Sequence, residues 1–133
     1  MSAEKKKPII LIVEDEPALA RILKANLSMQ GFDIALAHSG EEALRLVREL
    51  TPRLILLDVM LPDKDGYTVL KEIRQQESKK KRRSKVPVIM QSARGLPTEI
   101  LCETEGISGF VHKPYKLDDL LAAVKGALGR SPH

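Results

Sequence analysis

Five side chains suited to an ion-binding or phosphoryl-accepting site stand at, or just after, the ends of short apolar segments. They are Glu14 and Asp15 after residues 9–13, Asp58 after 54–57, Ser92 after 86–90 and Lys113 after 109–111. Carboxylates brought close together repel one another unless a bound cation or an ammonium group offsets the repulsion. Lys113 can supply the ammonium group, and the three acidic residues can bind a cation.

The kind of cation follows from the ligand atoms. Oxygen ligands with no histidine or cysteine nearby favour a hard ion, and a few carboxylates combined with water and phosphate oxygens suit Mg²⁺ best. Such an ion and Lys113 would neutralise the charge that develops as a phosphoryl group moves to an aspartate oxygen, while the Ser92 hydroxyl donates to another phosphoryl oxygen. In this interpretation Asp58 is the nucleophile.

The elements that must position these residues are visible in the hydrophobic pattern, in which runs of strand length alternate with segments of helical spacing. Pro17 suits a first helical position, and Ser39 suits an N-cap. The expected strands are 9–13, 32–37, 54–57, 86–90 and 109–111, and the expected helices are 17–31, 40–50, 67–76, 97–105 and 117–128.

This alternation predicts an α/β fold, a doubly wound parallel sheet with helices on both faces. In such sheets ligands bind outside the carboxyl ends of the strands, near the point where strand order reverses. The five site residues are therefore expected to meet at one edge of the sheet.

Four segments, in this order and at this spacing, carry a resemblance to a known family. They are ILIVEDEP at 10–17, LLDVMLPDKDG at 56–66, SA at 92–93 and GFVHKP at 109–114. Over nearly its whole length the chain resembles a response-regulator receiver domain of bacterial two-component signalling.

The resemblance implies a flavodoxin-like sheet of five strands in the order 2-1-3-4-5. It implies that Glu14, Asp15, Asp58 and the backbone carbonyl of Met60 hold Mg²⁺, and that the peptide bond before Pro114 is cis. Asp58 would accept a phosphoryl group from a histidine kinase or phosphotransfer protein. Such a domain promotes its own phosphorylation and dephosphorylation and is not an enzyme that turns over an external substrate.

The resemblance also implies a switch. On phosphorylation Ser92 would move toward the phosphoryl group and Phe110 would turn inward, which changes the face formed by the fourth helix, fifth strand and fifth helix. A downstream protein partner would read that face. Two residues depart from the usual pattern: Gln91 stands where an apolar residue is more usual, and Phe110 lacks the hydroxyl of a tyrosine.

Other residues near the predicted site are assigned structural roles. Asp63 and Asp65 are interpreted as residues that shape the loop, rather than as ligands. Met29, Met60 and Met90 are interpreted as packing residues, apart from the carbonyl role implied for Met60.

Charge is concentrated in two basic runs, which hold nine of the 22 basic residues: Lys5, Lys6 and Lys7, then Lys79, Lys80, Lys81, Arg82, Arg83 and Lys85. The rest of the chain has 13 basic and 18 acidic residues, a net charge of −5. The second run is interpreted as a solvated loop or, alternatively, as a docking patch for an acidic protein surface or nucleic acid. Nucleic acid binding is disfavoured because no aromatic residues interleave with the basic ones.

Docking through that patch would make the domain a phosphorylation-independent scaffold, the second function considered. A third, a nucleotide- or flavin-binding enzyme, is disfavoured because no GxGxxG or GxxxxGK[ST] loop follows any strand.

A length of 133 residues predicts one domain at 8–129, flanked by a basic tail at 1–7 and a short tail at 130–133. The single cysteine, Cys102, cannot form an intramolecular disulfide, and no apolar run suggests a signal peptide or a membrane span, so a cytoplasmic location is expected. No output domain is visible after the last helix, which leaves a stand-alone receiver or a piece of a longer protein as alternatives.

Overall fold

Five parallel strands form one sheet in the computed structural model, which describes residues 7–80, 85–92 and 107–129. The strands are β1 (Ile9–Val13), β2 (Asp33–Ala37), β3 (Leu54–Asp58), β4 (Val88–Ser92) and β5 (Gly109–His112). Their spatial order is β2-β1-β3-β4-β5. This order confirms the predicted doubly wound, flavodoxin-like sheet, whose order reverses between β1 and β3.

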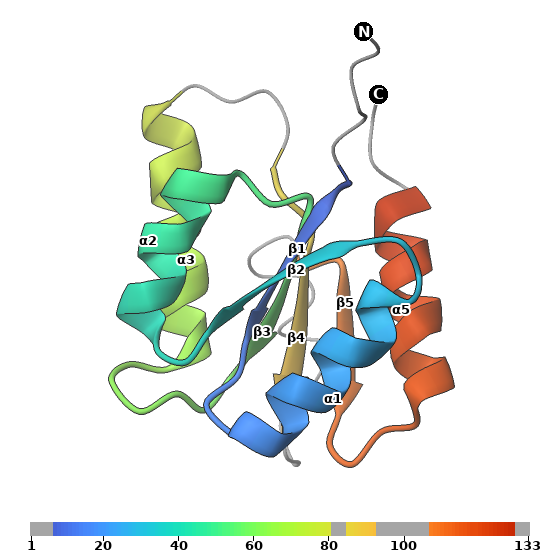
Figure 1. The fold of residues 1–133 in the computed structure, drawn as a ribbon. Helices are drawn as coiled ribbons and strands as arrows, with labels where there is room; N and C mark the ends of the chain where they lie inside the picture. The colour runs from blue at the N-terminus through green and yellow to red at the C-terminus, as the bar shows by residue number, and fades with distance from the viewer. Residues whose placement is uncertain (1–6, 81–84, 93–106, 130–133) are drawn as a thin grey trace, which may run out of the picture.

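Helices cover both faces of the sheet, as predicted (Figure 1). α2 (Gly40–Leu50) and α3 (Gly66–Lys79) pack on one face. α1 (Pro17–Ser28) and α5 (Leu117–Gly129) pack on the other. The helix expected at 97–105 lies outside the described residues.

The central strands are apolar along their whole length because both of their faces are covered. Successive strand residues point to opposite faces of a sheet. Leu11, Ile55 and Leu57 accordingly belong to the core beneath α2 and α3, and Ile12 and Leu56 belong to the core beneath α1 and α5. All five are fully buried.

The prediction for β4 was wrong at its start, since the strand begins at Val88 rather than at residue 86. The Val86 N–H donates to Glu77 Oε2 over 2.7 Å, so it is committed to the end of α3. Pro87 has no N–H to donate to a neighbouring strand. The Val86 hydrogen bond and the missing N–H of Pro87 therefore explain why the strand starts two residues later than predicted.

Two of the three methionines assigned to packing are exposed instead. Met90 is fully buried, but Met29 is 82% exposed and Met60 is 69% exposed. Met29 lies just beyond the last residue of α1, and Met60 lies in the loop after β3, so neither faces the sheet. Ile22, which fits the helical spacing of α1, is also exposed at 56%.

Candidate functional site

The strand register places Glu14, Asp58 and Gln91 in one row at the carboxyl edge of the sheet. Val13 of β1 pairs with Leu57 of β3, and Asp58 pairs with Gln91 of β4. Because residues two apart on a strand share a face, this row continues the apolar residues that pack beneath α1 and α5. The polar site therefore lies where a buried apolar face ends, at the carboxyl ends of the strands.

Three carboxylates form a cluster at this edge. One oxygen each of Glu14, Asp15 and Asp58 lies within 4.8 Å of the other two. Glu14 is 1% exposed and Asp58 is 3% exposed, whereas Asp15 is open to solvent. A donor set made only of carboxylate oxygens fits a hard divalent ion such as Mg²⁺.

Lys113 joins two of the three carboxylates, as predicted. Its Nζ donates to Glu14 Oε1 and to Asp58 Oδ2, each over 2.9 Å. Burial alone would lower the pKa of Lys113, but the hydrogen bonds to Asp58 and Glu14 outweigh it and leave the pKa raised. Burial raises the pKa of Glu14, and the hydrogen bond from Lys113 partly opposes that rise.

A backbone N–H group donates to Asp58, and a cis peptide bond follows Lys113. The Met60 N–H donates to Asp58 Oδ1 over 3.0 Å, so both oxygens of the Asp58 carboxylate have a donor. The peptide bond between Lys113 and Pro114 is cis, which confirms the implied feature. The implied role of the Met60 carbonyl as a metal ligand stays a prediction.

Ser92 lies at the same edge, and Phe110 lies two paired positions deeper in the sheet. Ser92 ends β4, is 3% exposed, and its backbone carbonyl accepts from the Lys113 N–H over 2.6 Å. Phe110 is half-buried in β5 against the core beneath α2 and α3, with its ring 5.0 Å from that of His112. The movement expected of Ser92 and Phe110 stays a prediction.

The two aspartates of the β3–α3 loop shape that loop, as predicted. Asp63 accepts from the Gly40 N–H over 2.8 Å and from the Glu41 N–H over 2.9 Å, and so holds the amino end of α2. Asp65 accepts from the Thr68 N–H over 2.9 Å and caps α3. Neither belongs to the acidic cluster found among the described residues.

Gln91 and Tyr115 are contacts of the site that were not assigned a role from the sequence. Gln91 is fully buried, and its Nε2 donates to Glu14 Oε1 over 3.2 Å. The Tyr115 hydroxyl donates to Gln91 Oε1 over 2.8 Å. The available signal was the amide side chain itself, since a polar residue in an otherwise apolar strand needs a partner.

The described basic residues of the second run, which are Lys79, Lys80 and Lys85, lie away from this site. α3 begins beside Asp58 and runs to the opposite edge of the sheet, where it ends at Lys79 (Figure 1). Lys80 caps that end, and Lys85 precedes β4. Lys81, Arg82 and Arg83 lie outside the described residues.

Comparison with known proteins points to one family. The family model described as "Response regulator receiver domain" matches residues 10–125. The transcriptional regulatory protein TrcR of Mycobacterium tuberculosis is 34% identical over 125 residues, which cover 93% of this chain and 46% of TrcR. The chain spans about half the length of the curated relatives it matches.

Two solved structures show the same fold over most of both chains. The non-phosphorylated HemR receiver domain of Leptospira biflexa is 29% identical with a TM-score of 0.83, covering 96% of this chain and 99% of that one. The receiver domain of the sensor histidine kinase PA1611 of Pseudomonas aeruginosa is 30% identical with a TM-score of 0.78, covering 94% and 99%. That structure has a magnesium ion coordinated in its active-site cleft.

None of the helices in the described part of the chain combines the length and the apolar character that crossing a bilayer requires.

Proposed function

This chain belongs to the response regulator receiver family, and from that membership we propose that it is a phosphorylation-dependent switch with Asp58 as the phosphoacceptor. Receiver domains are signalling switches rather than enzymes that turn over an external substrate. The observation that carries the proposal is the Asp58 carboxylate, buried beside two further carboxylates and held 2.9 Å from the Lys113 ammonium group.

The side chains divide the chemistry between them. One Asp58 carboxylate oxygen forms the new bond to phosphorus while the bond from phosphorus to the histidine nitrogen of the donor breaks. Lys113 neutralises negative charge beside Asp58, and the Ser92 hydroxyl donates to a phosphoryl oxygen. Glu14, Asp15, Asp58 and the Met60 carbonyl would hold Mg²⁺, which when bound supplies further positive charge at the phosphoryl oxygens.

Two partners belong to this proposal. The phosphoryl donor is a histidine kinase or a phosphotransfer protein, and a downstream protein reads the face formed by β5 and α5. Phe110 is the candidate residue that changes this face. We propose that the domain spans residues 8–129, because β1 begins at Ile9 and α5 ends at Gly129. We also propose a cytoplasmic location.

The proposal is tested by intact-mass measurement after incubation with Mg²⁺ and acetyl phosphate. The unaltered protein should gain one phosphoryl mass, and Asp58→Asn should gain none. Asp63→Asn is the matched control, because Asp63 lies in the adjoining loop but outside the acidic cluster, and it should still be labelled. Equal labelling of the unaltered protein and Asp58→Asn would refute the assignment.

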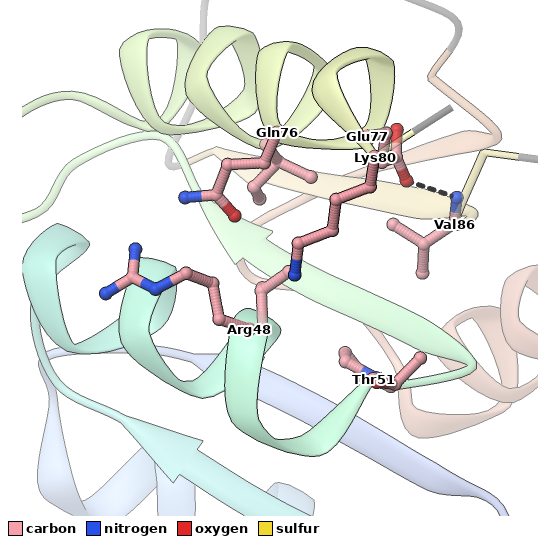
Figure 2. Close-up of a pocket in the computed structure, with 9 residues that line it drawn as sticks. Arg48, Thr51, Gln76, Glu77, Lys80 and Val86 are labelled. Atoms are coloured by element: carbon pink, nitrogen blue, oxygen red, sulfur yellow. Dashed lines mark hydrogen bonds between the residues drawn. The ribbon is translucent and has the colours of Figure 1, made fainter. Parts of the chain in front are cut away.

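A second function, the docking of an acidic protein surface, is proposed for the opposite edge of the sheet. There the ends of α2 and α3 enclose a cavity of about 30 Å³, and Figure 2 shows Arg48 of α2 and Lys80 after α3 at its lining. A space of this size holds a few water molecules at most and is too small for an organic ligand. An acidic partner would therefore be bound by the basic side chains on the surface around it.

The docking proposal predicts salt-sensitive retention of the protein on immobilised poly-glutamate. Replacing Lys79, Lys80 and Lys85 together by glutamine should weaken that retention. Retention that is unchanged by the triple substitution would rule out a contribution of these three residues to docking.

A further inference from the structure

Gln91 occupies a position on β4 where the neighbouring residues are apolar. Ile89, two residues earlier on the same strand, and Val111, its pairing partner on β5, both belong to the core beneath α1 and α5. Gln91 is fully buried among them. A buried amide is unfavourable unless its polar atoms are hydrogen-bonded, so the contacts of Gln91 define its role.

The orientation of the Gln91 amide follows from its partners. An ionised carboxylate can only accept hydrogen bonds, so the NH₂ group of Gln91 must face Glu14 Oε1, at 3.2 Å. The amide oxygen then faces the Tyr115 hydroxyl, which must donate, over 2.8 Å. Burial, and the nearby charges of Glu14 and Asp58, raise the pKa of Tyr115 and so preserve the proton that it donates.

Among the described residues, Gln91 is an uncharged side-chain donor to Glu14. The Lys113 ammonium group also donates to Glu14, but it is shared with Asp58. The Glu16 N–H donates to the second oxygen, Oε2, over 3.1 Å. The hydrogen bond from Lys113 to Glu14 thus depends on the state of Asp58, which Lys113 also contacts. The hydrogen bond from Gln91 to Glu14 does not involve the Asp58 carboxylate.

Tyr115 connects this arrangement to the segment after β5. It stands two residues beyond Lys113 and packs against the core beneath α1 and α5. Its hydroxyl donates to the amide oxygen of Gln91. The orientation of Glu14 is thus tied to β4 and to the segment after β5.

We propose that Gln91 is a positioning residue for the Glu14 carboxylate, and that the Tyr115 hydroxyl fixes Gln91 in turn. Together they set the orientation in which Glu14 meets Mg²⁺. This inference rests on the proposed function, since it concerns the same acidic site. Hydrogen bonds that orient the side chains holding a metal typically change metal affinity by about tenfold or more when they are removed.

The test is a calorimetric titration of the full chain with Mg²⁺. Gln91→Leu keeps a similar volume without the hydrogen bonds and should raise the Mg²⁺ dissociation constant about tenfold. Tyr115→Phe removes only the hydroxyl and should raise it about threefold, by loosening Gln91. The double variant should match Gln91→Leu, because Tyr115 acts through Gln91.

Two further measurements separate positioning from a general loss of structure. Tyr67→Phe is the matched control, because the Tyr67 hydroxyl is buried with no hydrogen-bond partner among the described residues, and it should leave Mg²⁺ affinity unchanged. The rate at which acetyl phosphate phosphorylates Gln91→Leu should rise toward that of the unaltered protein as the Mg²⁺ concentration is raised, because added ion offsets weaker binding.

Failure of the positioning role and failure of the proposed function give different results. If the unaltered protein binds Mg²⁺ and is phosphorylated, but neither Gln91→Leu nor Tyr115→Phe changes Mg²⁺ affinity, the positioning role is overturned and the proposed function stands. If the unaltered protein binds no Mg²⁺, both are overturned. Should Gln91→Leu fail to fold, the affinity of Tyr115→Phe relative to Tyr67→Phe decides the question.

Discussion

Two lysines of this protein each bridge a pair of carboxylates, but in different surroundings. Lys113 joins Glu14 and Asp58, whose side chains are 1% and 4% exposed. Lys64 joins Glu41 and Glu72, whose side chains are 73% and 37% exposed. Removing one partner of a buried pair leaves an uncompensated buried charge, whereas water screens the groups of a surface pair.

We therefore expect Lys113→Met to lower the free energy of unfolding by about 3 kcal/mol at low Mg²⁺ concentration. Lys64→Met is the control, and it should produce little measurable change. Urea unfolding of the two variants provides the comparison. Similar losses in both would contradict the importance given to burial at the acidic site.

The β3–α3 loop ties β3 to two helices. Asp63 binds the first backbone N–H groups of α2, and the Gly66 N–H donates to the Val59 carbonyl over 2.7 Å. The loop therefore holds the amino ends of α2 and α3 next to Asp58. Substitutions that disturb either contact should affect stability.

Asp63→Ala should lower the free energy of unfolding by about 1 kcal/mol near neutral pH, the usual effect of losing an N-terminal cap. The hydrogen bond from the Gly40 N–H lowers the pKa of Asp63 below its ordinary 3.8. Its contribution is therefore present above pH 3.8 and is lost as the pH falls through the lower pKa of the folded state.

The measurement compares urea unfolding of Asp63→Ala and the unaltered protein at neutral pH and in acid well below pH 3.8. The difference in stability should shrink in acid. Asp63→Asn, which keeps an acceptor without the charge, should lie between the two. A difference that is the same at both pH values would show that the carboxylate charge does not contribute.

Gly66 is required by a close approach to Asp58. A Cβ at residue 66 would collide with the Asp58 backbone carbonyl and lie 2.9 Å from Val59 Cα. Because backbone atoms cannot move aside cheaply, Gly66→Ala should lower the free energy of unfolding by about 2 kcal/mol and slow the labelling of Asp58.

Gly126 provides the control for that substitution. It lies within α5 and a Cβ there would meet no atom within 4 Å, so Gly126→Ala should stabilise the protein by about 0.5–1 kcal/mol. Thermal unfolding reports both changes. Equal effects at the two glycines would contradict the role given to the close approach at Gly66.

At the scale of the whole molecule, the sequence predicted the class of sheet, its strand order and the edge at which the site lies. Hydrophobic periodicity located the strands, and the resemblance supplied their order. The start of β4 could not be predicted, because it depends on Glu77 reaching Val86 from the end of α3. Met60 could not be recognised as exposed, because the direction of a loop is not encoded in periodicity.

Within the site, Glu14, Asp15, Asp58 and Lys113 are brought together as the spacing predicted. The link from Glu14 through Gln91 to Tyr115 escaped prediction. Gln91 and Tyr115 are 24 residues apart, and their contact depends on how β4, β5 and the following segment pack. Only the atypical residue, and not its partner, was visible in the sequence.

The fold also separates Lys79, Lys80 and Lys85 from the acidic site. α3 spans Gly66 to Lys79, a length of about 20 Å, which exceeds the distance of about 8 Å over which salt screens charges. Replacing Lys79, Lys80 and Lys85 by glutamine should therefore leave the rate of phosphorylation by acetyl phosphate unchanged within about twofold. A larger change would show that the two edges are coupled.

We propose that Asp58 carries the phosphoryl group. The most direct test of this assignment is to reduce the acetyl phosphate-treated protein with borohydride and to analyse its peptides by mass spectrometry. Borohydride converts a phosphorylated aspartate to homoserine. We predict homoserine at position 58 alone, formed only when Mg²⁺ is present during phosphorylation. Homoserine at Asp15 or Asp63, or none at position 58, would contradict the assignment.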